Sequence, residues 1–549
     1  MTKTKNQSII TIVLAILFVV SPLISFAQNL EEKFDTLLNE KYKPDGPGAT
    51  VLISKKGEII YHKAFGLANM ELETPMKTDN VFEIGSITKQ FTAVAILMLM
   101  EQGKLTIQDE ITKFIPDYPT HGKKITIHHL LNHTSGIKSY TSMNLSEIAA
   151  KDMTPTELID YFKNEPMDFD PGTEWRYNNS GYIILGYIIE KTSGQTYEDF
   201  IEEHIFKKLN MNDSRYGHKG EIIKNRASGY QTRDGYVNAN YLSMTLPYAA
   251  GSLMSTVKDL HKWQNAINTN MLVKAETIQK AFQNTKLNNG KPTYYGYGWT
   301  VNEINGTPTI EHGGGIFGYT SYQLYIPDED VHAAILTNCN CNSPTDITIR
   351  LAAIAIGKSY DNKEKITLPK EDLQQLVGVY EFEDSAVRII TLEENQLYSQ
   401  REGSSKFKIF PKNKTTFFYD DSFSEIQFNK NNKKTEAVFI NRINKSKGEK
   451  TDRPIPSEKK AIKVSEDVLK QYVGIYEISK GFDLKVTLEN GKLISQATGQ
   501  GPIEIHAETE AKFFVKEFAA AIEFIKENDK VTSLVLHQGG QKTPAKKKE

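Results

Sequence analysis

The sequence predicts a mixed α/β fold in which an antiparallel sheet is flanked by helices and is followed by two small antiparallel β-barrel-like repeats. Strand-like segments stand near both ends of the first 360 residues, with helical segments between them, which favours one sheet built from the two ends. Beyond residue 360 the chain changes to short alternating strands rich in Lys, Asn and Thr. A segment also recurs in this second part, which indicates two copies of one structural unit.

These observations divide the 549 residues into six parts. They are a signal peptide at 1–27, a main domain at 28–360, a first barrel-like repeat at 366–445, a charged linker at 446–464, a second repeat at 465–541 and a basic tail at 542–549. A length of about 150 residues per domain allows three or four domains, in agreement with this division.

The N-terminus predicts export. Lys3 and Lys5 precede an apolar run at 9–24, and Ser25-Phe26-Ala27 offers small residues for cleavage after Ala27. A membrane anchor is the competing interpretation, because the apolar run approaches the length needed to span a bilayer. We favour cleavage, which places the mature chain in the periplasm or outside the cell with no stable membrane span.

The charge balance excludes one class of partner. The chain has 66 basic and 68 acidic residues, and this near-neutral balance shows no footprint for nucleic acid. The basic tail is interpreted as a solubilising end. The expected partner is a small-molecule or peptide substrate, and the oligomeric state is left open.

The main domain opens and closes with predicted hairpins. Segments 49–54 and 58–62 form the first, around a Lys55-Lys56-Gly57 turn, and segments 321–326 and 332–337 form the last. Between them, an apolar helix at 90–103 stops at a glycine, and helical segments broken by prolines run from 106 to 243. A helix at 345–356 ends the domain.

The repeat is clearest at two short segments. Leu373-Gln374-Gln375-Leu376-Val377-Gly378-Val379-Tyr380-Glu381 matches Leu469-Lys470-Gln471-Tyr472-Val473-Gly474-Ile475-Tyr476-Glu477. Each copy continues through a strand pair and later an aromatic-rich strand, which predicts two antiparallel barrels or curled sheets.

Three separated clusters carry candidate chemistry. Ser86 and Lys89 stand at i, i+3, a spacing that places a hydroxyl and an amine on one helical face. Tyr177-Asn178-Asn179 supplies a phenol and an amide, and His312-Gly313-Gly314 supplies an imidazole next to glycines that allow close approach to the backbone. A serine hydroxyl attacks a carbonyl only when a neighbouring base removes its proton, so the set predicts serine acyl transfer.

The S-x-x-K pattern alone is weak evidence, because it also occurs at Ser135, Ser255, Ser405 and Ser457. Only Ser86 clearly opens a buried helix. The positive end of that helix favours developing negative charge, and the Ser86 N–H can face an oxyanion.

With these residues in view, the chain resembles the serine beta-lactamase and penicillin-binding protein superfamily, most closely its class C-like branch of beta-lactamases, DD-peptidases, esterases and D-aminopeptidases. The resemblance covers roughly residues 30–358 and rests on the three clusters and on two further segments, Ile127-His128-His129-Leu130-Leu131-Asn132-His133-Thr134-Ser135-Gly136-Ile137 and Tyr177-Asn178-Asn179-Ser180-Gly181-Tyr182. It implies the beta-lactamase/DD-peptidase-like sheet and helices. The paired C-terminal repeats resemble the barrels of D-aminopeptidases.

The resemblance also implies roles for the candidate residues. Ser86 is the nucleophile, and Lys89 and Tyr177 are the proton shuttle. Burial favours the neutral form of Lys89, and the nearby amine favours deprotonation of Tyr177, so which of them is the base stays open.

The substrate-binding roles follow in the same way. Asn179 hydrogen-bonds the substrate acyl group, and His312 orients a substrate carboxylate or the Tyr177 hydroxyl. Gly314 is a substrate-binding position, where a glycine lets the substrate approach the backbone closely, and Gly315 gives the second oxyanion N–H. No cofactor is implied.

The third cluster departs from class C lactamases, which usually carry Lys-Thr-Gly where this chain has His312-Gly313-Gly314. The missing lysine argues against efficient lactam binding, since a carboxylate gains most from a fixed cation. We therefore expect an esterase or a D-amino-acid-specific peptidase. The alternatives are a class C-like beta-lactamase or DD-carboxypeptidase, and a catalytically silent protein that binds peptidoglycan fragments.

Two residue pairs invite a metal or disulfide and are interpreted otherwise. His129 and His133 stand at i, i+4, but the glutamate of H-E-x-x-H is missing, so no metal site is predicted. Cys339 and Cys341 stand at i, i+2 in a strand-like segment, where a direct disulfide would be strained. We expect two small core residues there.

Overall fold

The computed structural model describes residues 29–233, 235–341, 343–360, 363–420, 422–431, 434–456, 461–479, 482–498, 500–516, 520–538 and 541–548. The predicted signal peptide and its cleavage site lie outside these residues. The chain divides into two units, one of residues 1–232 and 236–360 and the other of residues 233–235 and 361–549.

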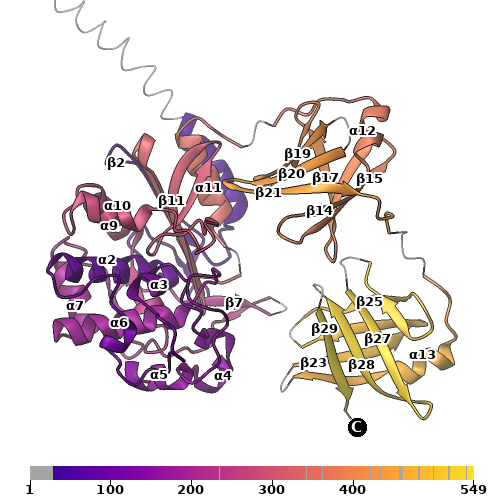
Figure 1. Cartoon of the computed structure of the whole chain (residues 1–549), viewed down its shortest axis with the longest axis horizontal. Coiled ribbons are helices and arrows are strands. Elements are labelled where there is room, and N and C mark those ends of the chain that lie inside the picture. Colours follow the sequence, from indigo (N-terminus) through magenta and orange to yellow (C-terminus); the bar gives the residue numbers. More distant parts are fainter. Residues whose placement is uncertain are drawn as a thin grey trace, which may run out of the picture. The chain divides into compact units, whose positions relative to one another are not determined.

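The first unit is organised around a six-stranded antiparallel sheet with the order β10-β11-β12-β13-β1-β2 (Figure 1). The first and last hairpins of the domain meet at its centre, where Ala49 pairs with Thr337. This confirms a sheet built from the two ends of the domain. Its strands are β1 (Ala49–Lys55), β2 (Glu58–Phe65), β10 (Thr300–Ile304), β11 (Thr307–Ile316), β12 (Tyr319–Ile326) and β13 (Val331–Thr337).

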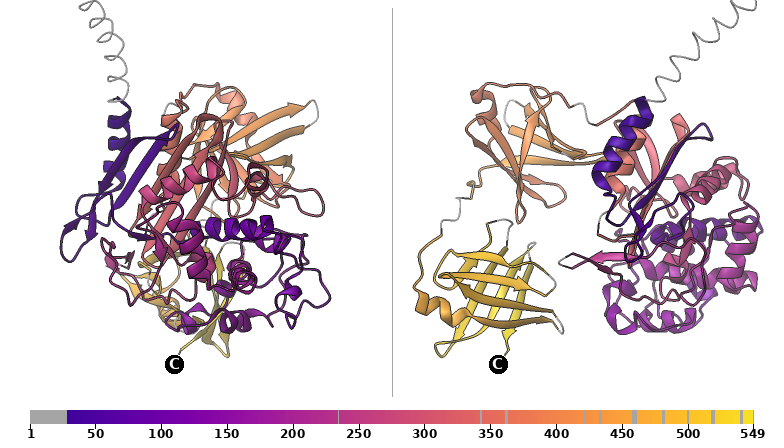
Figure 2. Two further views of the ribbon diagram at one scale, coloured as in Figure 1. Left: turned by 90° about the vertical axis from the view of Figure 1, so that its left-hand side faces the viewer. Right: turned by 180° about the vertical axis from the view of Figure 1, so that it is seen from behind.

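Helices and short sheets complete the unit. An N-terminal helix at 29–41 lies beside the first strands of the sheet (Figure 2). It packs on β2, where the rings of Phe34 and Tyr61 are 5.2 Å apart. The other α-helices of eight residues or more are α2 (Thr88–Glu101), α5 (Pro155–Phe162), α6 (Asn179–Ser193), α9 (Val257–Asn268), α10 (Ala275–Phe282) and α11 (Thr345–Ala355). Shorter ones are α3 (Ile127–Leu131), α4 (Leu145–Ile148), α7 (Tyr197–Ile201) and α8 (Tyr248–Gly251).

The core of this unit explains why α2 forms where it does. Every residue of α2 from Thr88 to Leu99 is buried, so the helix is covered on all sides and packs inside the domain. It ends at Gln102, and Gly103 then takes the left-handed backbone conformation with φ of 71°. The predicted glycine stop is thus confirmed.

A three-stranded sheet, β5-β9-β6, lies beside α2. It consists of β5 (Phe82–Glu83), β9 (Leu253–Ser255) and β6 (Arg215–Tyr216). β5 leads directly into the first candidate cluster. Two smaller pairs are β3 (Leu67–Asn69) with β4 (Thr74–Pro75), and β7 (Tyr230–Thr232) with β8 (Tyr236–Asn238).

The second unit contains two closed eight-stranded barrels, each preceded by a short helix. The first has α12 (Lys370–Leu376) and strands β14 (Gly378–Phe382), β15 (Val387–Glu393), β16 (Gln396–Arg401), β17 (Lys406–Pro411), β18 (Thr416–Tyr419), β19 (Ser424–Asn431), β20 (Lys434–Asn441) and β21 (Asn444–Thr451). The second has α13 (Glu466–Tyr472) and strands β22 (Gly474–Ser479), β23 (Phe482–Glu489), β24 (Lys492–Ala497), β25 (Ile503–Ala507), β26 (Lys512–Phe514), β27 (Ala520–Glu527), β28 (Lys530–Gln538) and β29 (Gln541–Lys547).

The repeat is visible in matching details of the two barrels. The Tyr380 hydroxyl donates to the Leu376 carbonyl at 2.8 Å, and the Tyr476 hydroxyl donates to the Tyr472 carbonyl at the same distance. Each tyrosine therefore fastens the helix to the first strand of its barrel.

Two predicted boundaries are wrong. The first barrel does not end at 445, because β21 continues to Thr451 and closes the barrel against β14. The basic tail at 542–549 is not a free end, because β29 contains most of it and pairs with β28 and β22. Both segments are rich in lysine, and closing an antiparallel barrel depends on backbone hydrogen bonds that a charged strand supplies as well as an apolar one.

The two cysteines are bonded to each other, which corrects the prediction of two unpaired core residues. The strand β13 ends at Thr337, and after a single bridge at Cys339 the chain turns at Asn340 and Cys341. The turn brings their Cα atoms to 5.2 Å, within the range that a disulfide spans.

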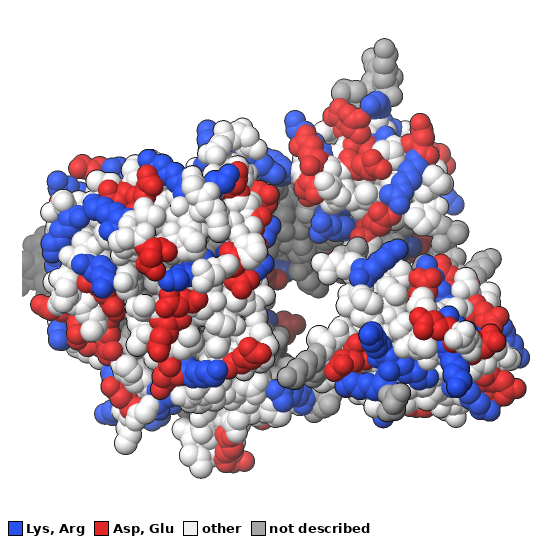
Figure 3. All heavy atoms as spheres, turned by 60° about the horizontal axis from the view of Figure 1, so that its bottom comes forward, with Lys and Arg blue, Asp and Glu red and all other residues white. Residues whose placement is uncertain are grey.

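Acidic and basic side chains are interspersed over the face drawn in Figure 3. In the part of the chain that the structure describes, no helix is both long and apolar enough to cross a bilayer.

Candidate active site

Ser86 lies at the start of the buried helix, where the chain turns sharply. Gly85 has a φ of 52° and links β5 to a 3₁₀ turn, Gly85–Ile87, which runs directly into α2. From Val81 to Leu99, Ser86 alone is not fully buried. The hydroxyl is therefore accessible at the N-terminal end of a helical run, whose first N–H groups lack partners within the helix.

Glu83 holds the strand that precedes the serine. Its carboxylate, 1% exposed, accepts hydrogen bonds from Lys219 at 2.5 Å and Arg226 at 3.0 Å. A buried carboxylate that is paired with two cations holds the strand that leads into the turn with Ser86.

Lys89 is fully buried, and its amine has three polar neighbours. Nζ lies 3.0 Å from Ser86 Oγ, 2.9 Å from Asn179 Oδ1 and 2.8 Å from the Ala250 carbonyl oxygen. Burial holds the pKa of Lys89 well below its ordinary value of 10.5. A neutral amine has two hydrogens and one lone pair, so donation to Asn179 and Ala250 leaves the lone pair for the Ser86 hydroxyl.

Asn179 begins α6, and it bonds protein groups on both sides of its amide. Asn178 caps the helix by accepting from the Gly181 N–H at 2.8 Å, which sets the direction of the Asn179 side chain. The Asn179 oxygen accepts from Lys89, and its amide nitrogen donates to Thr141 Oγ1 at 3.1 Å. The amide nitrogen has a second hydrogen, which leaves one donor for the predicted substrate contact.

Tyr177 lies over the amine rather than beside it. Lys89 Nζ is 4.8 Å from the centre of the Tyr177 ring, and the buried Tyr177 hydroxyl has no hydrogen-bond partner of fitting geometry among the described residues. Burial raises the pKa of Tyr177. This effect outweighs that of the neighbouring Ser86, which favours the ionised form of the phenol. This differs from the expectation that the nearby amine makes the phenol a base.

His312 is buried and neutral. Its Nε2 lies 2.8 Å from the Tyr295 hydroxyl, and its Nδ1 lies 2.6 Å from the Gly313 carbonyl. Burial is the main cause that lowers the pKa of His312 to about 3. Both ring nitrogens have partners within the protein, so neither of them contacts the Tyr177 hydroxyl in this structure.

The glycines of the third cluster allow β11 to pack closely against the turn that carries Ser86. A Cβ on Gly85 would lie 2.9 Å from the backbone nitrogen of Gly315, so this nitrogen is next to the turn that carries Ser86. Gly314 packs so closely that a Cβ there would overlap the Ile84 carbonyl and Ser321 Oγ. A Cβ on Gly315 would meet no protein atom within 4 Å.

Substituting Gly314 with alanine is expected to destabilise the domain by about 1–3 kcal/mol, because the added methyl group forces β11 away from Ile84. Thermal unfolding monitored by circular dichroism measures the loss. Gly315→Ala is the matched control and should unfold at the wild-type temperature. Equal stability of the Gly314→Ala protein would contradict the close packing.

Sequence reasoning missed several residues of the site, which are Thr141, Tyr295, His133 and the Ala250 backbone. Tyr295 and His133 form an aromatic cluster with Tyr177, and the His133 ring lies 4.4 Å from that of Tyr177. His133 Nδ1 accepts from the Asn178 N–H at 3.2 Å. Tyr295 has no motif around it, and the Ala250 group is a main-chain carbonyl, so no local signal marks either one.

The histidine pair at 129 and 133 has structural contacts. His129 completes the N-terminal cap of α3 with Thr126, and His133 is buried below Tyr177. Among the described residues, no group of three or more His, Cys, Asp or Glu side chains could hold a metal ion.

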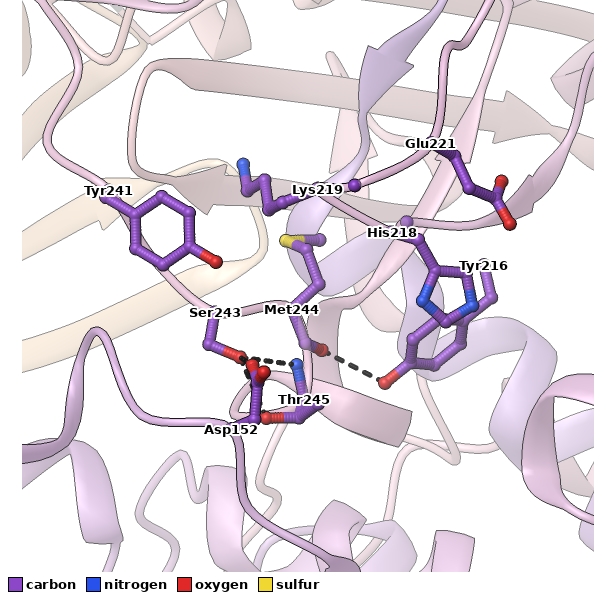
Figure 4. A pocket seen from close by; sticks show the side chains of 11 residues that line it. Asp152, Tyr216, His218, Lys219, Glu221, Tyr241, Ser243, Met244 and Thr245 are labelled. Atoms are coloured by element: carbon purple, nitrogen blue, oxygen red, sulfur yellow. Dashed lines mark hydrogen bonds between the residues drawn. The ribbon is translucent and has the colours of Figure 1, made fainter.

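A cavity of about 400 Å³ lies beside the loop that leads to Ala250 (Figure 4). Segments 216–221 and 241–245 line it together with Asp152. The Ser243 hydroxyl donates to Asp152 at 2.5 Å and fixes one wall. None of the predicted site residues lines this cavity.

Comparison with known proteins identifies the family. The model of the Beta-lactamase family matches residues 28–356, more than half of the chain. The chain belongs to the beta-lactamase family. This confirms the resemblance seen in the motifs, and the family is one of serine hydrolases. A second model, a domain of unknown function (DUF3471), matches residues 458–547, which include the second barrel.

Relatives of this beta-lactamase family member include penicillin-binding proteins. The chain is 32% identical to "Penicillin-binding protein 4*" of Bacillus subtilis (strain 168) over 73% of this chain and 93% of that protein. It is 30% identical to the putative penicillin-binding protein PbpX of the same organism over 50% of this chain and 68% of that protein.

Solved structures of the family have the same fold. An octameric penicillin-binding protein homologue from Pyrococcus abyssi is 28% identical, with a TM-score of 0.54, over 76% of this chain and 99% of that one. A D-amino acid amidase from Ochrobactrum anthropi SV3 has a TM-score of 0.54 at 24% identity over 60% of this chain and 100% of that one, and this likeness concerns the fold.

Proposed function

We propose that the protein is an exported serine hydrolase that forms an acyl-enzyme on Ser86 and acts on esters or D-amino-acid amides and peptides more readily than on beta-lactams. The observation that carries this proposal is the contact of 3.0 Å between Ser86 Oγ and the buried Lys89 amine. That amine has acceptors for both of its hydrogens and a lone pair for the serine proton.

The first half of the reaction follows from these contacts. Lys89 takes the Ser86 proton while Oγ bonds to the substrate carbonyl carbon, and the carbonyl electron pair moves to oxygen. The oxyanion is stabilised by the N–H groups of Ser86 and Gly315. Collapse of this intermediate breaks the bond to the leaving group, which takes the proton from Lys89, directly or through the Tyr177 hydroxyl, and the acyl-enzyme remains.

Water completes the cycle. It attacks the ester carbon while Lys89 takes its proton, and the same two N–H groups stabilise the second oxyanion. Breaking of the ester bond returns the proton to Ser86 Oγ and releases a carboxylic acid. Both attack steps, by Ser86 and by water, start from the neutral form of Lys89, which burial favours.

The substrate preference rests on His312. A lactam or a peptide C-terminus gains most from a fixed cation, and His312 is neutral with both ring nitrogens occupied. An ester, or an amide without a carboxylate at that position, does not need a cation at His312 for binding. A D-amino acid amidase among the structures of the same fold is consistent with this preference.

A second candidate is a DD-carboxypeptidase that also binds penicillin. The relatives named as penicillin-binding proteins favour it. The two candidates differ in whether a substrate carboxylate is required.

The test is a panel of substrates together with an active-site label. p-Nitrophenyl acetate, D-alanyl p-nitroanilide and nitrocefin are hydrolysed in parallel, and a fluorophosphonate probe is mapped by peptide mass spectrometry. We expect ester or D-alanyl turnover well above nitrocefin turnover, with the label on Ser86.

Strong nitrocefin turnover would overturn the preference for esters and D-amino-acid amides and would favour a class C-like beta-lactamase. Slow binding without turnover would favour a catalytically silent binder of peptidoglycan fragments. A label on another residue would overturn the assignment of the nucleophile.

A further inference from the structure

The two barrels share one architecture, but their interiors differ at one end. The strand pairs β15-β16 and β23-β24 match position by position, because Ile390 pairs with Ser399 in the first barrel and Val486 pairs with Ser495 in the second. The repeat therefore offers an internal comparison at each neighbouring position.

The next pair on the same face, two residues further along each strand, is the one that differs. In the first barrel Arg388 stands directly opposite Arg401, whereas in the second Leu484 stands opposite Ala497. Side chains alternate along a strand, so Arg388 lies on the same face as the core residue Ile390 and points inward. Leu484 and Ala497 lie within or against the second core in the ordinary way.

The aromatic neighbours of Arg388 also have aliphatic counterparts in the second barrel. The guanidinium carbon is 3.5 Å from the centre of the Phe439 ring and 5.7 Å from that of Phe382. Strand register places Leu536 and Ile478 at the matching positions of the second barrel, where both pack on its core. An aliphatic end in one barrel thus corresponds to a cation and two aromatic faces in the other.

The two arginines have no carboxylate partner among the described residues. Neither forms an ion pair with a described residue, and Nε of Arg388 is buried without a hydrogen-bond partner among those residues. Burial is the main cause that lowers the pKa of Arg388, and Arg401 lowers it further, whereas Tyr419 and Asp384 act in the opposite direction. The acid next to Arg401, Glu402, is paired with Arg453 instead.

Like charges placed directly opposite each other on a sheet are destabilising, and a buried donor without an acceptor adds to that cost. An anion between the two guanidinium groups removes both costs. Arg388 is half-buried and Arg401 is exposed, so the position can be reached from solvent.

We propose that this end of the first barrel binds an organic carboxylate, held between Arg388 and Arg401, with its apolar body against Phe382 and Phe439. A planar carboxylate matches the fork of a guanidinium. The aromatic faces favour a monoanion with an apolar body over strongly hydrated inorganic phosphate. This site is independent of the acyl-transfer chemistry proposed above.

The probe is 4-phenylbutyrate, titrated by calorimetry into the full chain with the Ser86→Ala substitution. The test variant is Arg388→Leu/Arg401→Ala, which installs the residues of the second barrel. We expect a loss of affinity of about tenfold or more, because hydrogen bonds to charged groups are removed. Lys412→Ala is the matched control: Lys412 pairs with Glu425 outside the Arg388–Arg401 pair, and its removal should leave the affinity unchanged.

Two further measurements keep the result interpretable. The double variant should melt at or above the temperature of its parent without ligand, since it loses a like-charge pair. If the double variant fails to fold, Arg401→Ala alone is tested in its place. The Arg401 side chain is exposed, so its loss should leave the fold intact and weaken binding of 4-phenylbutyrate.

The proposal is overturned if the parent shows no binding at millimolar concentration, or if the double variant binds equally well. Equal binding of the neutral 4-phenylbutyramide, or binding of inorganic phosphate in place of the carboxylate, would also overturn it.

Discussion

Replacing Ser86 with alanine is expected to lower kcat for every ester and amide substrate by about 10⁴-fold or more, because no other group in the site can form the acyl-enzyme. The fold should be unaffected, since Ser86 is the partly exposed residue in an otherwise buried stretch and its loss leaves no large cavity. Initial rates with p-nitrophenyl acetate and the thermal unfolding temperature, measured on the same preparation, check both statements.

Ser405→Ala is the matched control for this substitution. Ser405 begins another S-x-x-K pattern, with Lys408, but it lies in the first barrel between β16 and β17. Wild-type activity is expected there. Retention of more than about 1% of activity by the Ser86→Ala protein would exclude Ser86 as the nucleophile.

Replacing Lys89 with methionine is expected to reduce the rate of acylation by about 10²- to 10⁴-fold, the range that general-base catalysis contributes. Methionine preserves much of the buried volume but has no lone pair for the Ser86 proton. It also leaves Asn179 Oδ1 and the Ala250 carbonyl without the donor that they share. Stopped-flow measurement of the p-nitrophenol burst gives the acylation rate.

Lys89→Arg separates the base from a mere positive charge. Arginine is protonated at all working pH values, so it should fail as completely as methionine if Lys89 acts as the base. Recovery of activity with arginine would show that the charge alone is required.

The hydrolytic activity is expected to decrease at low pH. Activity requires the neutral amine and should fall as the pH decreases through the pKa of Lys89, which burial places well below 10.5. The rate should therefore still be high at pH values where an exposed lysine is fully protonated. Tyr177→Phe should leave this acidic limb in place, because burial raises the pKa of Tyr177. Loss of the limb in that variant would identify the phenol as the base.

Much of the fold could be predicted from short segments. The terminal hairpins, the helix that follows Ser86 and its stop at Gly103 depend on alternation, apolar runs and glycine, all of which act within a few residues. The repeat was visible because Tyr380 and Tyr476 stand in nearly identical segments.

The boundaries of the barrels were less predictable. Charged composition suggested a linker after 445 and a free tail after 541, yet β21 and β29 are the strands that close the two barrels. Whether a lysine-rich segment becomes a strand depends on an unpaired edge elsewhere in the chain, and a local pattern does not contain that information.

From the residue order alone came the fold class, the family resemblance and the identity of Ser86, Lys89, Tyr177, Asn179 and His312 as candidates, because each stands in a motif or at a helical spacing. Only the folded chain decided their chemical states. Burial makes Lys89 the candidate base, keeps Tyr177 protonated and leaves His312 neutral against Tyr295. Cys339 and Cys341 are bonded because the backbone turns between them, and Arg388 faces Arg401 because two strands pair in that register. Protonation and pairing depend on the solvent and charges around a group, and those are set by residues distant in the sequence.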